Sequence, residues 1–439
     1  MISKFKDFIK ISFVQDVGIL QVGKFLSIFL GAVSSIILAR LLQPELYGIY
    51  GLIFAFVALV GIFIDWGASY ASLTLLAENY TKKNKQEIKN VLTYFIKITF
   101  LAILVVGVLG LILAPLLTEL LYENSRIGSL ARIILISTFL GVVYNLLVIV
   151  LQAIRKIKRL TILESSEKII HSLLPVAFIL IGWGLVGVIW GHLVSILIFL
   201  IYSVFAYSSL VKKDSLLPSF KQIFYNLRKI KIRKYFNFGF SIALDKNLGR
   251  LVSLMPIIFL GIFALPQEVG YFKIAFAYIS IPIMILSPIS RLLSVQLPKS
   301  KTLGFKILKE HFYKTAFYSG LVSVLLVIPF LILAPYLIKF FYGQEYIESI
   351  RLVYYLAIFA ALSGFGVGLA PFYRTADKMK TSIIINIFQV ILMTVLTIIL
   401  VKIFSSLIAV ILALIITTTI FLLLHFGVVA NILRKNSYE

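Results

Sequence analysis

Three cations lie within long apolar stretches of the sequence: Lys24, Lys246 and Arg250. Lys24 is about fourteen residues from either end of its stretch, roughly 20 Å along a helix, which is too deep for its ammonium to reach water easily. Lys246 and Arg250 are four residues apart and share one helix face, where like charges repel. Each cation costs about 2.5–3.5 kcal/mol at the centre of a bilayer, and Asp245 can offset only one of them. The pattern predicts a cleft that binds an anionic group such as a diphosphate.

Other charged residues interrupt the apolar stretches as well. Lys273 lies nearer the end of its stretch and is predicted to be a second binding station for the same anion. Asp65 is an isolated carboxylate that needs a cationic partner or a proton. Glu164 and Glu167 each have a basic or titratable residue four positions later, with which they can pair. For these carboxylates and Asp245, both an ion-coupling role and a structural role stay open.

Metal and cofactor chemistry finds little support in the sequence. The four histidines fall in or beside four different apolar stretches without ligand spacing, and cysteine is absent. No phosphate-binding loop is present, because the glycines of 364–368 and the pair Gly187 and Gly191 lie within apolar stretches. Such small-residue pairs indicate close helix contacts. We predict no metal and no cofactor.

Composition indicates the environment. The chain has 439 residues, of which 61% are hydrophobic and 14% charged, and its mean hydropathy is +1.04. Soluble domains are nearer 45–50% apolar and about 25% charged. The sequence therefore predicts an integral membrane protein.

The apolar runs predict an all-α fold with about twelve membrane helices, since one span needs roughly 20 apolar residues. Their apolar residues are continuous rather than alternating, which favours helices. The predicted spans are 11–39, 47–75, 91–121, 130–152, 162–182, 184–211, 235–262, 270–297, 312–341, 350–373, 381–401 and 405–432.

The net charge of +24 is distributed by side of the membrane. Most basic residues fall in the two termini and every second loop, whereas the other loops contain only Arg40, Arg126 and Lys402. Cytoplasmic loops have such a basic excess, so both termini are predicted to be cytoplasmic. Because the charge is explained by topology, no nucleic-acid partner is expected, and no N-terminal stretch has the features of a cleaved signal peptide.

Internal repetition divides the chain into two halves. LILAPLLTELLY at 111–122 recurs as LILAPYLIKFFY at 331–342, and PELYGIYGLIFAF at 44–56 recurs as PQEVGYFKIAFAY at 266–278. A weaker correspondence joins Arg155 to Arg374. The halves are predicted to be parallel six-helix lobes, an arrangement found in secondary transporters.

The predicted organisation has a lobe at 1–211, a linker at 212–234 and a second lobe at 235–439. The linker has apolar residues at helical spacing and many Lys and Arg residues. It resembles an amphipathic helix at the cytoplasmic membrane surface, although a linker without stable helix is the alternative.

The stretch ARLLQPELYGIYGLIFAFVALVGIFIDWG at 39–67 resembles the start of Wzx-type polysaccharide flippases of the multidrug/oligosaccharidyl-lipid/polysaccharide exporter superfamily. There an Ala-Arg-Leu-Leu stretch, a proline, an acidic residue and a Tyr-Gly-x-Tyr turn precede a late Asp-x-Gly, here Asp65-Trp66-Gly67. LQAIRKIKR at 151–159 is similar to the family's basic exit from helix 4. Gln43 departs from the glycine common in the family.

The resemblance implies a flippase of the cytoplasmic membrane rather than an enzyme. Its substrate would be an undecaprenyl-diphosphate oligosaccharide for surface polysaccharide such as O-antigen, with polymerase or ligase machinery as a further partner. Two alternatives stay open: a cation-coupled multidrug exporter of the same superfamily and a polysaccharide polymerase or ligase. The latter generally needs a sizeable outer loop, and the longest here, such as 122–129, have roughly eight residues.

Overall fold

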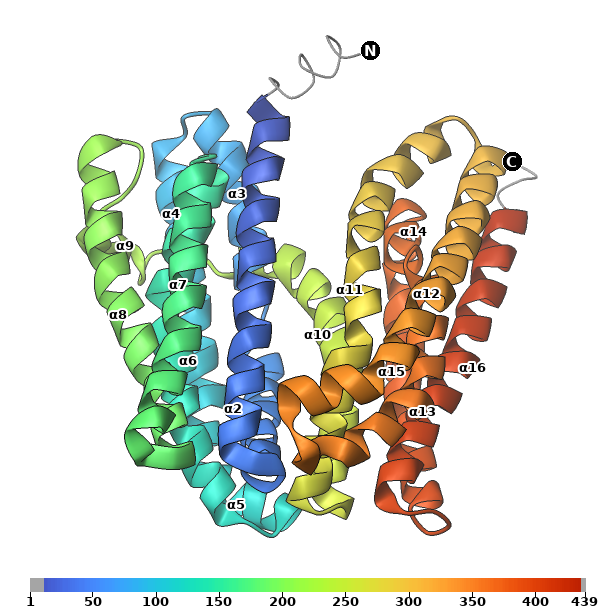
Figure 1. The fold of residues 1–439 in the computed structure, drawn as a ribbon. Coiled ribbons are helices and arrows are strands. Elements are labelled where there is room, and N and C mark those ends of the chain that lie inside the picture. Colours follow the sequence, from blue (N-terminus) through green and yellow to red (C-terminus); the bar gives the residue numbers. More distant parts are fainter. Residues whose placement is uncertain (1–11, 436–439) are drawn as a thin grey trace. The chain divides into compact units, whose positions relative to one another are not determined.

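The computed structural model describes residues 12–435, apart from a few side chains that include that of Lys24 (Figure 1). This range is helical almost throughout and contains no β-strand. The prediction of an all-α chain is therefore confirmed.

Ten helical segments of the described range are long and apolar enough to cross a membrane, and two of them contain a break. Helix α2 (Ser12–Ile64) breaks at Gln43, where φ is 61°, directly before Pro44. Proline has no N–H to donate and disfavours helical backbone at the preceding residue. The segment Ile157–Lys213 breaks near Gly182, where φ is 93°. Two spans in each broken segment give the predicted twelve, while the cytoplasmic placement of the termini stays a prediction.

The chain divides into two compact units, and the boundaries fall inside helices. Unit 1 comprises Met1–Leu42 and Phe56–Leu244, and unit 2 comprises Gln43–Ala55 and Asp245–Glu439. The segment that begins at the break in α2 therefore packs with the C-terminal half of the sequence.

Unit 1 is a bundle in which α8 packs against both α6 and α7 (Figure 1). Its core contains large aromatic and aliphatic side chains, including Tyr94, Phe95 and Phe199. In a bilayer this close packing stabilises through van der Waals contact rather than removal from water. Besides the first part of α2, its helices are α3 (Ala68–Thr81), α4 (Lys85–Ala102), the π-turn Ile103–Gly107, α5 (Val108–Tyr122), α6 (Ser125–Ala153), α7 (Ile157–Phe178), the π-turn Ile179–Trp183, α8 (Gly184–Lys213) and α9 (Phe220–Asn226).

Unit 2 is built the same way, with α13 packed against both α11 and α12. A smaller core around Phe312, Phe372 and Tyr373 joins α12 and α14. Its helices are α10 (Arg233–Phe263, from Asp245 on), α11 (Pro266–Thr302), α12 (Phe305–Tyr342), α13 (Ile347–Ser363), α14 (Leu369–Thr375), α15 (Met379–Leu400) and α16 (Ser406–Lys435), with short 3₁₀ turns at Gln344–Tyr346 and Gly364–Gly366.

Residues with positive φ mark equivalent helix ends in the two halves. Such residues follow α3, α5 and α6, and they recur 220–222 residues later after α11, α12 and α14. The pairs are Lys83 and Gly304, Glu123 and Gly343, and Arg155 and Asp377. The two halves therefore repeat not only apolar sequence but also the backbone turns between helices.

One predicted correspondence is wrong by three residues. Lys156 N–H donates to Leu151 O, and Lys378 N–H donates to Tyr373 O, each at 2.9 Å. These equivalent helix-ending bonds align Arg155 with Asp377 rather than with Arg374. Matching the arginine side chains misled the alignment because the backbone turn, not the charge, is what repeats.

The repeated Pro-x-x-x-Gly stretches pack directly on each other within unit 2. A Cβ at Gly48 would lie 1.7 Å from the carbonyl oxygen of Pro266, and a Cβ at Gly270 would lie 2.2 Å from that of Pro44. Only glycine permits backbones this close. The contact is reciprocal, which explains why both glycines occur in the repeat.

The segment predicted as a linker is mostly packed onto unit 1. Between the end of α8 at Lys213 and the start of α10 at Arg233, it is helical only at α9, where Ser219 and Gln222 form a capping box. Its apolar residues Leu217, Ile223 and Ile230 lie in the core of unit 1, so they face protein rather than lipid. A hydrogen bond of 2.7 Å from Tyr80 Oη to Asp214 ties the start of this segment to α3 and raises the pKa of Tyr80 to about 12.

Candidate functional site

Helix α10 belongs to unit 2 from Asp245 on, and the first two turns of this part contain several polar side chains. Asp245 and Lys246 are half-buried, Asn247 is buried, and Arg250 is exposed. A Cβ at Gly249 would meet no atom within 4 Å, so this part of α10 borders open space. The i,i+4 spacing keeps Lys246 and Arg250 on one face, which gives an accessible pair of cations that suits an anionic ligand.

Asp245 fixes this stretch to another helix of unit 2. Its Oδ1 accepts a hydrogen bond of 3.3 Å from the Ser382 hydroxyl on α15. Asp245 therefore has a positioning contact in addition to any interaction with the neighbouring cations.

The third predicted cation is in the other unit. Lys24 belongs to α2 in unit 1, and its side chain lies outside the described part of the structure. Its predicted convergence with Lys246 and Arg250 stays a prediction.

Lys273 on α11 is held by aromatic rings. Its Nζ lies 4.1 Å from the ring centroids of both Tyr47 and Tyr50. Gly51 makes room for the lysine stem, since a Cβ there would lie 3.1 Å from Lys273 Cδ. This cation–π contact stabilises the packing of 43–55 on unit 2, and the predicted binding of a diphosphate would require the ammonium to leave the rings.

Asp65 lies at a helix break, so the predicted continuous span 47–75 is wrong. Helix α2 ends at Ile64, and the Gly67 N–H donates to Asp65 Oδ1 at 3.1 Å. Gly67 has φ of 79°, and a Cβ there would lie 2.1 Å from Gly239 O. The Asp-x-Gly motif thus forms the turn that starts α3 and brings α10 against it.

The carboxylates of α7 differ in their contacts. Glu164 is exposed, whereas Glu167 is half-buried with Oε1 at 3.7 Å from His171 Nδ1, so the two groups of this predicted pair lie near each other without a hydrogen bond. The Lys168 side chain reaches toward α2 instead, with Cε 3.4 Å from the position of a Cβ on Gly31.

Sequence reasoning missed a contact between two histidines. His171 Nε2 and His192 Nδ1 are 3.0 Å apart, and the ring centroids are 4.4 Å apart. His192 is on α8, 21 positions away in the sequence, so no helical spacing could reveal the pair. Among the described residues, no group of three His, Asp or Glu side chains could hold a metal ion.

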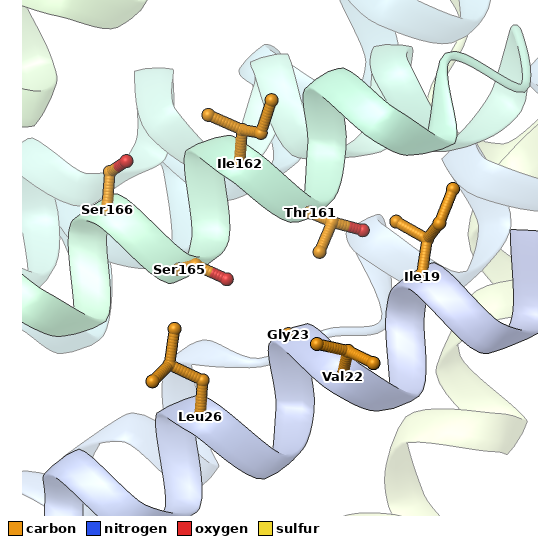
Figure 2. A pocket seen from close by; sticks show the side chains of 8 residues that line it. All are labelled: Ile19, Val22, Gly23, Leu26, Thr161, Ile162, Ser165 and Ser166. Carbon is orange, nitrogen blue, oxygen red and sulfur yellow. The ribbon is translucent and has the colours of Figure 1, made fainter.

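A groove of about 690 Å³ lies between α2 and α7 in unit 1 (Figure 2). The wall from α2 is apolar, while the wall from α7 includes three hydroxyls. Its lining residues are Ile19, Val22, Gly23, Leu26, Thr161, Ile162, Ser165 and Ser166. Such a lining suits a hydrocarbon chain better than a diphosphate.

Comparison with known families gives one extended match. The family model described as "Polysaccharide biosynthesis protein" matches residues 37–351. Among curated proteins, none matches the sequence.

Several solved structures have a similar fold. The inward-facing structure of a multidrug resistance MATE family transporter of the MOP superfamily has a TM-score of 0.74 and 18% identity, covering 93% of this chain and 96% of that one. An outward-facing structure with the same description has a TM-score of 0.63 and 16% identity, covering 95% and 96%. A MOP superfamily transporter from Pyrococcus furiosus, described as having a binding pocket of reverse polarity, has a TM-score of 0.60 and 16% identity, covering 95% of each chain. At these identities the likeness shows the fold, which is the two-lobed fold of MATE transporters.

Proposed function

Because this chain belongs to the polysaccharide biosynthesis protein family, we propose that it moves a lipid-linked oligosaccharide from the inner to the outer leaflet of the cytoplasmic membrane. The chain is a multi-pass membrane transporter with the MATE fold. The substrate would be an undecaprenyl-diphosphate glycan, and the movement would follow alternating access of the two units. A polymerase or ligase would then use the exported glycan.

The observation that supports this best is the family match combined with the two accessible cations of α10. A diphosphate has several anionic oxygens and no cationic group, so its passage through a membrane needs basic partners. Lys246 supplies a compact charge, and the Arg250 guanidinium can bind two oxygens together. Asp245, bonded to Ser382, orients this turn of α10.

The multidrug exporter is the second candidate because two of the similar structures are of multidrug resistance transporters. The Pyrococcus furiosus protein is described as having reverse pocket polarity and a different function, so the fold does not select one kind of cargo. A cationic drug would be repelled by Lys246 and Arg250. Their charge therefore favours an anionic substrate.

An enzymatic role has less support. A polymerase or ligase needs room for a site in its outer loops, and the connections predicted to be outside are short. The segment between α5 and α6 is Glu123–Asn124, and α10 and α11 are separated by Ala264 and Leu265.

Reconstituted vesicles provide the test. A fluorescent polyprenyl-diphosphate oligosaccharide is placed in liposomes with the purified chain, and a membrane-impermeant quencher reports how much reaches the outer leaflet. We expect Lys246→Ala and Arg250→Ala each to slow this movement at least tenfold. Lys314→Ala is the matched control, because Lys314 is an exposed cation paired with Glu310.

The alternatives give different results in the same vesicles. Movement of a cationic dye, but not of the diphosphate lipid, would refute the proposal and favour drug export. Wild-type rates in both α10 variants would be compatible with the proposed transport but would show that these two cations are not part of the substrate site.

A further inference from the structure

We propose that His171, His192 and Glu167 form a site in unit 1 that binds one exchangeable proton. The three groups form a chain of contacts across two helices. Glu167 Oε1 is 3.7 Å from His171 Nδ1, and His171 Nε2 is 3.0 Å from His192 Nδ1. Histidine is the side chain whose charge ordinarily changes between pH 5 and 8.

The contact between the rings limits the site to one added proton. At 3.0 Å the two nitrogens form a hydrogen bond, which requires one to donate and the other to accept. A protonated imidazole donates from both nitrogens. If both rings were protonated, two N–H groups would point at each other, so the pair accepts one proton and shares it.

The same distance argues against a metal ion as the ligand. Zinc binds each imidazole nitrogen at about 2.0–2.1 Å, and tetrahedral geometry then separates two nitrogens by roughly 3.3 Å. The observed 3.0 Å is shorter and matches an N–H···N hydrogen bond.

Glu167 supplies the counter-charge for the bound proton. His171 Nδ1 is buried and makes no hydrogen bond in the described structure. When His171 is protonated, this nitrogen becomes a donor that faces Glu167. Closing the 3.7 Å gap by about 0.9 Å would form a charge-assisted hydrogen bond of about 2.8 Å. The bound proton thus gains a partner that the neutral pair does not use.

Charge balance also favours the bound proton. On α7, Glu164, Glu167 and Lys168 together have a formal charge of −1, and one proton on the histidines makes the group neutral, as a bilayer interior favours. On α6 the titratable neighbour is Tyr144, whose phenol is near both carboxylates. Helix α8 has no charged residue before Lys212, and α2 has none between Lys24 and Arg40.

Tight packing of α7 on α8 holds the rings together. A Cβ at Gly191 would lie 2.7 Å from Pro175 Cα, and one at Gly187 would lie 3.1 Å from Phe178 O. The turn Ile179–Trp183, in which Gly182 has φ of 93°, joins the two helices. Gain or loss of the proton therefore changes a bond between α7 and α8. A role of this proton in transport rests on the proposed function, whereas the binding of the proton does not.

Histidine NMR tests the site directly. The protein is labelled on its imidazoles and reconstituted in nanodiscs, and signals are assigned with His171→Gln and His192→Gln. In the wild type we expect the pair to take up one proton between pH 8 and pH 5. In Glu167→Gln the midpoint should fall by at least one pH unit, a tenfold weaker binding of the proton. Glu310→Gln makes the same chemical change at an exposed site in unit 2 and should leave the midpoint unchanged.

Two separate titrations of the pair, or no titration in this range, would refute the site. An unchanged midpoint in Glu167→Gln would refute it as well. Flipping of the diphosphate lipid is then compared at pH 6 and pH 8 in wild type and His171→Gln, and the pH dependence should be lost in the variant. If the pair titrates as stated but no lipid moves, the proposed function fails and the proton site stands. If the lipid moves but the histidines titrate independently, the proton site fails and the proposed function stands.

Discussion

The reciprocal glycine contact in unit 2 allows a quantitative prediction. In Gly48→Ala the new methyl group would be placed 1.7 Å from Pro266 O, 2.7 Å from Pro266 C and 3.0 Å from Gly270 N. Carbon and oxygen ordinarily approach to about 3.3 Å, so the two backbones must separate by roughly 1.5 Å. Backbone atoms cannot rotate away as a side chain can. Overpacking of this kind costs about 1–3 kcal/mol and sometimes more.

The control for this substitution is Gly427→Ala. Gly427 is also inside a helix of unit 2, but a Cβ there would meet nothing within 4 Å. Alanine is favoured over glycine in a helix by about 0.5–1 kcal/mol, and both variants have this gain. The difference between them therefore isolates the steric cost.

Thermal unfolding of the purified variants in one detergent measures the difference. A change of 1 kcal/mol shifts Tm by about 2–4 °C for a unit of this size, so Gly48→Ala should melt about 2–12 °C below Gly427→Ala. Gly270→Ala should behave like Gly48→Ala, because its methyl group would lie 2.2 Å from Pro44 O. In the double variant Gly48→Ala/Gly270→Ala, the loss of Tm should be smaller than the sum of the two single losses, since one separation of the backbones relieves both contacts. Equal Tm values for Gly48→Ala and Gly427→Ala would refute the close packing.

Two further predictions concern contacts of basic side chains. Pro115 has no N–H to donate to Leu111 O, which instead accepts a hydrogen bond of 2.6 Å from Arg132 Nε. Arg132→Leu should therefore lower the free energy of unfolding by about 1–3 kcal/mol, and by less in a Pro115→Ala background, where alanine restores the N–H. Equal losses of thermal stability in both backgrounds would contradict this account. Tyr47→Leu removes one ring from Lys273 and should destabilise unit 2 by about 0.5–2 kcal/mol. If thermal unfolding shows that Tyr47→Leu lowers stability less in a Lys273→Met background than in the wild type, the cation–π contact is the cause.

Several features could be predicted because they depend on local chemistry. The number and lengths of the apolar runs predict the number of spans, and the repeated apolar stretches predict two halves. Glycine pairs four residues apart also predicted close helix contacts correctly. Gly187 and Gly191 pack against the end of α7, and a Cβ at Gly364 would lie 2.3 Å from Ser323 Cβ. The predicted family is confirmed by the match over 37–351.

Features set by tertiary contact could not be predicted. An apolar face at helical spacing shows that a segment packs on something, but not on what. The spacing of Leu217, Ile223 and Ile230 predicts a helix at the membrane surface, whereas these residues lie in the core of unit 1. His171 and His192 meet because a turn folds α8 back on α7. Their separation of 21 residues has no helical periodicity.

The two halves share a backbone plan but not their charges. The turns that end α6 and α14 align the halves at an offset of 222 residues. At this offset Glu164 and Glu167 of α7 correspond to Asn386 and Gln389 of α15. The carboxylate of the proposed proton site, Glu167, and its neighbour Glu164 are therefore replaced by neutral amides in unit 2.

The first helices of the halves show the opposite distribution. Lys24 of α2 corresponds to Lys246 of α10, but Arg250 corresponds to the apolar Ile28. A proton site needs a nearby carboxylate to balance the added charge, whereas a diphosphate site needs more cations than carboxylates. These requirements conflict within one cluster. A duplicated fold can meet both by placing proton chemistry on α7 of unit 1 and anion chemistry on α10 of unit 2.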